Sequence, residues 1–119
     1  MDSVWEKARE VGRLVSQTEE YKAFKRANER LSEDRDTVAL INRLSEMQET
    51  ISGALQRGEE PGEAERQEYE RIVGVVQVSG TYQAFESARA NFDRLMMRVE
   101  EEIAKGIDAG EQSRIILAG

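Results

Sequence analysis

Apolar residues recur every three or four positions along most of this chain, which is the spacing of amphipathic α-helices. We expect a first helix that is capped by Ser3, with Glu6 completing a capping box, and that ends at about Val15. Its apolar residues form one stripe, which we expect to face a core: Val4, Ala8, Val11 and Val15. Trp5 lies at the edge of this stripe and is expected to pack there.

Two later segments, Tyr21–Ala27 and Tyr82–Ala88, share the pattern Tyr-x-Ala-Phe-x-x-Ala. A hydroxyl residue stands three positions before each tyrosine, at Thr18 and Ser79, so each segment is expected to begin a capped helix. The same offset relates the apolar residues upstream, Val11 and Val15 with Ile72 and Val76. The first two helices are thus a loose counterpart of the last two, and both duplication and convergent packing account for the echo.

The most regular periodicity predicts a long helix from Thr37 to about Gln56. A turn at Ser32–Asp36 precedes it, and either Asp34 or Asp36 is expected to be its cap. A helix of this length spans about 30 Å, more than a compact small domain covers, so we expect an elongated hairpin. The breaker-rich segment 57–62 predicts the hairpin turn.

The segment after this turn is apolar on more than one side. Its run Ile72–Val78 is rich in β-branched residues, which favour strands, but we predict a helix because no second strand is available for pairing. Val75 and Val78 then lie off the main stripe, and a helix that is apolar on two sides is usually covered on both. In a small protein the second cover can be another subunit.

The last helix is expected from about Tyr82 to Lys105, ending at Gly106 and Gly110. Residues 106–119 then form a tail that is either frayed or docked on a neighbour. Met97 lies off the apolar face, and together with Val75 and Val78 it is our candidate for an oligomer interface.

These patterns predict an all-α fold over a single domain, residues 1–119. About five helices, two of them long, form an elongated helical hairpin or bundle that oligomerises through apolar stripes. We expect a dimer or a tetramer, because an isolated amphipathic hairpin of this length leaves apolar surface uncovered.

Composition narrows the possible functions. The net charge of −7 argues against a general binder of nucleic acids or anionic membranes. The chain has no Cys and no His, which removes thiolate nucleophiles, zinc fingers and imidazole acid–base catalysis. It also has no apolar run near the ~20 residues of a membrane span and no signal-peptide pattern. We expect a cytoplasmic protein without metal or cofactor.

One group of charges stands out in this acidic chain. Four basic residues share one side of the second helix, spanning about 140° at 100° per residue: Lys22, Lys25, Arg26 and Arg30. They suit an acidic partner protein or a short stretch of RNA backbone, and the alternative is ion pairing with Glu29 and Glu33. The echoed helix has Gln83, Glu86, Ser87 and Asn91 instead.

The acidic residues offer a second, weaker candidate. All-α pyrophosphatases bind Mg²⁺ through facing Glu-x-x-Glu and Glu-x-x-Asp pairs, and Glu65 with Glu68 matches the first pair. The second pair fails, because Glu86 is followed three positions later by Arg89. We therefore interpret these carboxylates as solvated surface, with a Mg²⁺-dependent nucleotide hydrolase as an alternative.

Five segments together carry a family resemblance over roughly residues 4–105: Trp5–Val11, Thr18–Phe24, the Leu31–Asp36 turn, Ile41–Leu55 and Tyr82–Ile103. In these the chain resembles the YlbF/YmcA family of small, all-helical bacterial proteins. The resemblance implies a cytoplasmic, non-enzymatic regulator that acts through protein–protein assembly. Members are associated with competence, sporulation and biofilm development, and some join a complex that directs a membrane-anchored endoribonuclease in mRNA processing.

Certain complexes of this family are linked to iron–sulfur clusters held by cysteines. Because the present chain has no Cys, that property does not carry over, and the chain looks closer to the shorter, cysteine-free branch. We expect a scaffolding protein that self-associates and recruits a protein partner. The alternative is an RNA-processing accessory that touches RNA through the four basic residues of the second helix.

Overall fold

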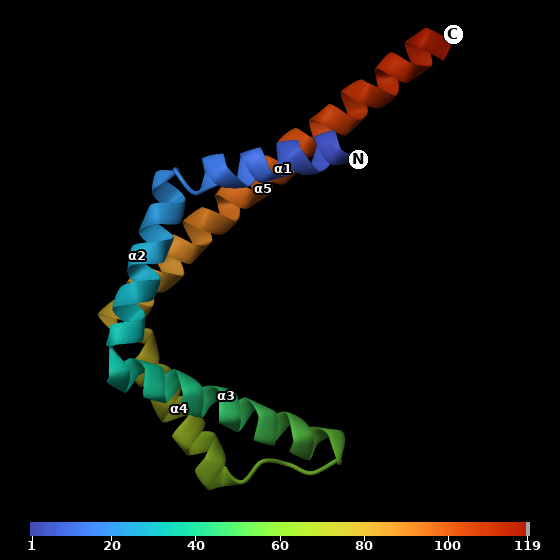
Figure 1. Cartoon of the computed structure of the whole chain (residues 1–119). Helices are drawn as coiled ribbons and strands as arrows, with labels where there is room; N and C mark the ends of the chain where they lie inside the picture. Colours follow the sequence, from blue (N-terminus) through green and yellow to red (C-terminus); the bar gives the residue numbers. More distant parts are fainter. Residues whose placement is uncertain (119) are drawn as a thin grey trace.

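The computed structural model describes residues 1–118 of the chain, with side chains described to Gln112, and every regular element in this part is an α-helix (Figure 1). The helices in order are α1 (Asp2–Val15), α2 (Glu19–Glu33), α3 (Arg35–Gln56), α4 (Glu63–Gln77) and α5 (Gly80–Ala118). The molecule extends over 68 × 38 × 23 Å, and its radius of gyration is 21.7 Å. A compact chain of this length would have a radius of about 13.5 Å. The predicted elongated, all-α fold is confirmed.

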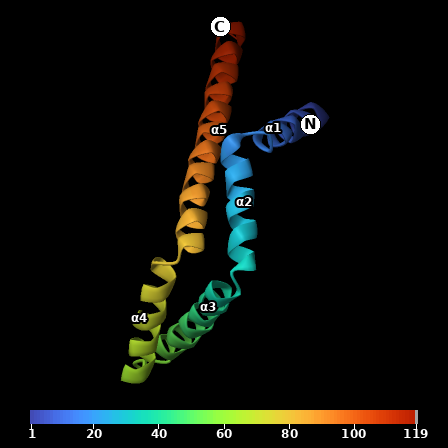
Figure 2. The ribbon, with the colours of Figure 1, turned by 90° about the vertical axis from the view of Figure 1, so that its left-hand side faces the viewer.

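The helices form a bent, V-shaped molecule (Figures 1 and 2). One arm is built on α5, with α2 alongside its first half and α1 facing its middle. The other arm is the hairpin of α3 and α4. The two arms meet at a vertex where α2 bends into α3 and α4 is followed by α5.

The echoed segments pack against each other across the α2–α5 pair. The ring centroid of Phe24 lies 5.6 Å from that of Phe85 and 5.3 Å from that of Phe92. The ring centroids of Tyr21 and Phe92 are 5.8 Å apart. These pairings make the two helices antiparallel. The equivalent alanines Ala27 and Ala88 are both buried, which allows the backbones to approach closely.

The predicted hydroxyl caps of these two segments are confirmed. Thr18 Oγ1 accepts a hydrogen bond from the Tyr21 N–H at 3.2 Å, and Ser79 Oγ accepts one from the Tyr82 N–H at 3.4 Å. The predicted cap at Ser3 is wrong, because α1 already begins at Asp2. The N-cap position is Met1, and no side chain forms a capping hydrogen bond there.

The N-cap of α3 is Asp34, and not the alternative Asp36. Its Oδ1 accepts a hydrogen bond from the Thr37 N–H at 3.3 Å. The same residue ends α2, so the predicted turn is reduced to one residue between two helices.

A cluster of buried apolar residues lies in the α3–α4 hairpin. Ile72 and Val76 of α4 and Met47 of α3 are buried, with Ile72 only 1% exposed. Partly buried residues surround this cluster: Leu40, Ile41, Leu44, Tyr69 and Tyr82. The hairpin turn falls at 57–62 as predicted, and Gly58 there has a φ of +77°, a conformation that glycine adopts without a Cβ penalty.

The predicted end of the last helix at Gly106 and Gly110 is wrong. The helix continues through both glycines to Ala118. A glycine inside a helix costs about 1 kcal/mol relative to alanine, which is a penalty and not a stop signal. A stop of that kind uses a left-handed residue, and Gly58 is the one glycine with positive φ among the described residues.

Candidate functional site

The basic face of α2, formed by Lys22, Lys25, Arg26 and Arg30, points away from the aromatic contact with α5. All four residues are exposed. In the described part of the chain none of them forms an ion pair, so the pairing with Glu29 and Glu33 is not observed. The four cations lie within nine residues, or about 12 Å of helix. This face presents a concentrated positive charge on a molecule whose total is −7.

The echoed positions in α5 have a different electrostatic state. Glu86 pairs with Arg89 at 2.8 Å, and this hydrogen bond is the main cause that raises the pKa of Arg89 above its ordinary value. Asn91 accepts a hydrogen bond from Arg94. The unpaired basic face therefore belongs to one half of the echo.

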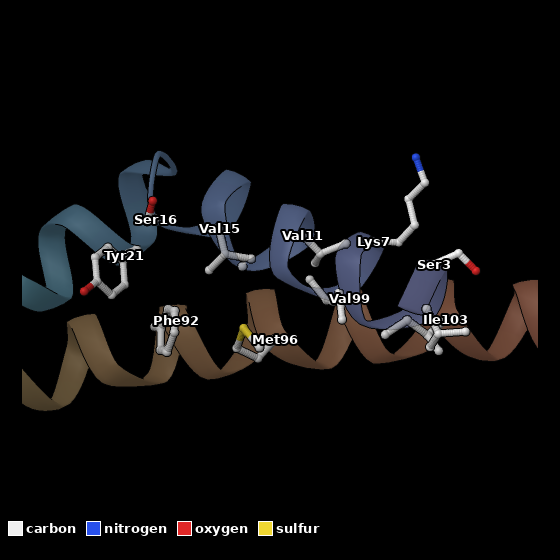
Figure 3. Close-up of a pocket in the computed structure, with 13 residues that line it drawn as sticks. Ser3, Lys7, Val11, Val15, Ser16, Tyr21, Phe92, Met96, Val99 and Ile103 are labelled. Atoms are coloured by element: carbon white, nitrogen blue, oxygen red, sulfur yellow. The ribbon is translucent and has the colours of Figure 1, made fainter. Parts of the chain in front are cut away.

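A second candidate surface is an open apolar groove between α1 and α5, with a volume of ≈ 940 Å³ (Figure 3). Val11 and Val15 of α1 point toward Phe92, Met96 and Val99 of α5 across this groove. Lys7 is the one charged residue in its lining. Figure 2 shows α1 diverging from α5 toward its N-terminus, which leaves the groove open.

The expectation that the apolar stripe of α1 is buried in a core is wrong. No residue of α1 is buried: Val4 is 52% exposed, Trp5 52% and Val11 37%. The equivalent residue of Val11 in the second half is Ile72, which is buried in a cluster with residues of α3 and with Tyr82 of α5. The stripe is present, but α5 faces it across an open groove and leaves it exposed.

The three residues expected at an oligomer interface do not form one patch. Val75, Val78 and Met97 are 44%, 75% and 59% exposed. The two valines lie at the end of α4 beside the vertex, whereas Met97 is 17 residues into α5, or about 26 Å along its axis. Their role in an interface stays a prediction.

The two carboxylates considered for Mg²⁺ are placed differently from a metal site. Glu68 accepts two hydrogen bonds from Arg43, at 3.2 Å from Nε and 3.4 Å from Nη2. This contact is the main cause that raises the pKa of Arg43, and it ties α3 to α4. Glu65 lines a pocket of only ≈ 40 Å³ beside Arg43. Across the described residues no three acidic side chains are grouped as metal ligands would be.

The vertex contains a polar cluster that the sequence reading missed. Asp34 Oδ2 accepts hydrogen bonds from the hydroxyls of Thr37 (2.8 Å) and Thr81 (2.7 Å), and Ser79 Oγ lies 3.1 Å from both of these hydroxyls. Thr37 is buried. The hydrogen bond from Thr81 is the main cause that lowers the pKa of Asp34, followed by those from Thr37. The cluster joins the start of α3 to the start of α5 and so fixes the angle between the arms.

None of the helices in residues 1–118 has both the length and the apolar character needed to cross a membrane.

A UPF0342 protein from Leuconostoc mesenteroides subsp. mesenteroides is 20% identical over 105 residues, which cover 88% of this chain and 90% of that protein. No solved structure matches the chain with significance. Residues 4–108 match the family described as "Control of competence regulator ComK, YlbF/YmcA". Since the match covers most of the chain, this protein belongs to the YlbF/YmcA family of regulatory proteins.

Proposed function

We propose that this protein is a non-enzymatic regulatory scaffold of the cytoplasm, built as one domain. It self-associates into a dimer or tetramer and recruits an acidic surface of a partner protein through the basic face of α2. Membership of a family described by its control of the competence regulator ComK supports a regulatory role.

The observation that carries this proposal is the basic face itself. Exposed cations that already have carboxylate partners gain little from a new partner, whereas the four residues of this face have none among the described residues. A positive patch on an acidic protein attracts acidic partners and repels other basic ones, which gives selectivity and a faster encounter. An acidic protein surface fits this face because several carboxylates can be matched to fixed cations on a rigid helix.

An RNA backbone is the competing ligand for the same face. The net charge of −7 opposes it, because only four cations act attractively while the rest of the surface repels phosphate. Binding to RNA would weaken steeply as the salt concentration rises, and it would not require a protein partner.

The experiment is a pull-down from native cytoplasm with the immobilised chain, carried out with and without ribonuclease. Arg26→Glu/Arg30→Glu is the test variant. Arg66→Glu/Arg71→Glu on α4 makes the same change of net charge at exposed residues outside the basic face. The proposal predicts a ribonuclease-resistant protein partner that is retained by the α4 variant and lost from the α2 variant. Equal capture by both variants contradicts it, and loss on ribonuclease treatment favours the RNA-processing alternative.

A further inference from the structure

Exposed apolar side chains are concentrated on the arm that carries the groove. Of the eleven large apolar side chains that are exposed in the described structure, seven belong to α1 or to α5 beyond Asp93. A monomeric soluble protein rarely leaves a contiguous apolar face of this kind uncovered. We therefore expect a binding partner to cover the apolar face of α1 and α5.

The lining of the groove defines the chemistry of that occupant. Lys7 is its one charged residue, and the other lining residues with polar side-chain atoms are Ser3, Ser16 and Tyr21. Phosphate-bearing ligands would find almost no charge partners here. From Phe92 to Ile103 the groove is about 17 Å long, which is three turns of helix. An amphipathic helix with an apolar stripe of three turns fits these dimensions.

α5 itself carries such a stripe. Met96, Val99 and Ile103 line the groove, and the stripe continues past it to Ile107, which is 64% exposed. One surface thus supplies both the groove and a helix of the kind that fills it. This self-complementarity is what a two-fold symmetric pair requires.

The charges along α5 select the direction of the pairing. Residues 100–111 carry five carboxylates and one lysine, whereas residues 84–95 carry two arginines and two carboxylates. A parallel pair would place the acidic segment against its own copy. An antiparallel pair that crosses near Met96 and Val99 places it against the neutral segment 84–95 of the other copy, which costs less in repulsion.

The area meets the lower limit for a specific pair. The face from Phe92 to Gln112 is about 30 Å long; it is about 20 Å wide where α1 flanks α5, as far as Ile103, and about 10 Å wide beyond, so it presents roughly 500 Å² per copy. Two copies then bury roughly 1,000 Å², the minimum expected of a specific protein–protein interface.

We propose that the groove is filled by the α1–α5 arm of a second copy, packed antiparallel about a two-fold axis close to Met96 and Val99. The inference rests on the self-association in the proposed function and adds the face, the direction and the register. Each α5 covers the α1 stripe of the other copy, so that Val4 and Val11 become buried in the assembly.

The first test is the solution mass of three proteins at micromolar concentration, with circular dichroism as the check of folding. Val99→Asp/Ile103→Asp places charges in the groove, and Ala39→Asp/Leu55→Asp makes the same change at exposed residues of α3. The proposal predicts dimers for the wild type and the α3 variant and a helical monomer for the groove variant. A groove variant that stays dimeric overturns the inference but leaves self-association intact. A monomeric wild type overturns both.

The second test does not depend on the groove variant folding. Because the chain has no Cys, single cysteines give a clean background for disulfide crosslinking. Near the proposed axis, Val99→Cys is expected to form a crosslinked dimer on mild oxidation. Gln112→Cys is expected to stay uncrosslinked, because the two copies of residue 112 lie roughly 40–45 Å apart in this register. Crosslinking at residue 112 and not at 99 would overturn the antiparallel arrangement.

Discussion

Thr81 donates a hydrogen bond of 2.7 Å to Asp34, a residue 47 positions earlier in the chain. The contact joins the bend between α2 and α3 to the first turn of α5. Around it the hydroxyls of Thr37 and Ser79 complete a part-buried cluster. The angle between the two arms, and with it the position of the basic face relative to the hairpin, depends on this cluster.

Asp34 is expected to make stability dependent on acid. Its carboxylate is held below its ordinary pKa of 3.8 in the folded protein, so the unfolded chain binds a proton first as the pH falls. The stabilisation is complete above the unfolded pKa and is lost as the pH drops through the lower folded pKa. Urea unfolding followed between pH 7 and pH 2.5 should show this loss in the wild type and a flatter profile in Asp34→Asn. Identical profiles for both proteins would contradict the role of the cluster.

The buried core of the hairpin predicts that two residues of α4 differ sharply in their contribution to the free energy of unfolding. Ile72→Ala removes a side chain that is 1% exposed and should lower the free energy of unfolding by about 2–5 kcal/mol. Val75→Ala, three residues later on the same helix and 44% exposed, should change it by less than about 0.5 kcal/mol. Chemical denaturation at low protein concentration measures both. Similar losses for the two variants would show that α4 packs on a different face.

The continuous α5 predicts opposite effects of alanine at different glycines. Gly106→Ala and Gly110→Ala meet no atom within 4 Å of the new Cβ and should each stabilise the helix by about 0.5–1 kcal/mol. Gly58→Ala should instead destabilise by about 1–2 kcal/mol, because its φ of +77° is unfavourable for a residue with a Cβ. Thermal unfolding followed by circular dichroism compares the three. Destabilisation by alanine at residue 106 or 110 would indicate a helix end there.

The pairing of Glu68 with Arg43 predicts no Mg²⁺-dependent nucleotide hydrolysis. The screen compares the wild type with Glu65→Gln/Glu68→Gln, using nucleoside triphosphates and diphosphates with Mg²⁺. We expect no turnover above background for either protein and no shift of the melting temperature on adding Mg²⁺. Hydrolysis by the wild type that is lost in the double variant would restore the hydrolase alternative.

Local signals in the sequence were sufficient for most of the fold. The hydroxyls of Thr18 and Ser79 and the 57–62 turn act through nearby atoms, so their roles could be predicted. The cluster at the vertex could not, because Thr81 meets Asp34 only through tertiary packing. The stripe from Val4 to Val15 shows the same limit: periodicity identifies an apolar face but does not say what covers it. For the basic face, helical periodicity was enough to identify the four residues, whereas the absence of ion partners among the described residues could be seen only in the structure.

The central claim, that the protein works as an assembled scaffold, is tested most directly by sedimentation equilibrium of the purified wild type at micromolar concentration. A chain of 13.5 kDa that assembles as proposed gives a mass of twice or four times this value. A single species at 13.5 kDa over the whole concentration range would contradict the account.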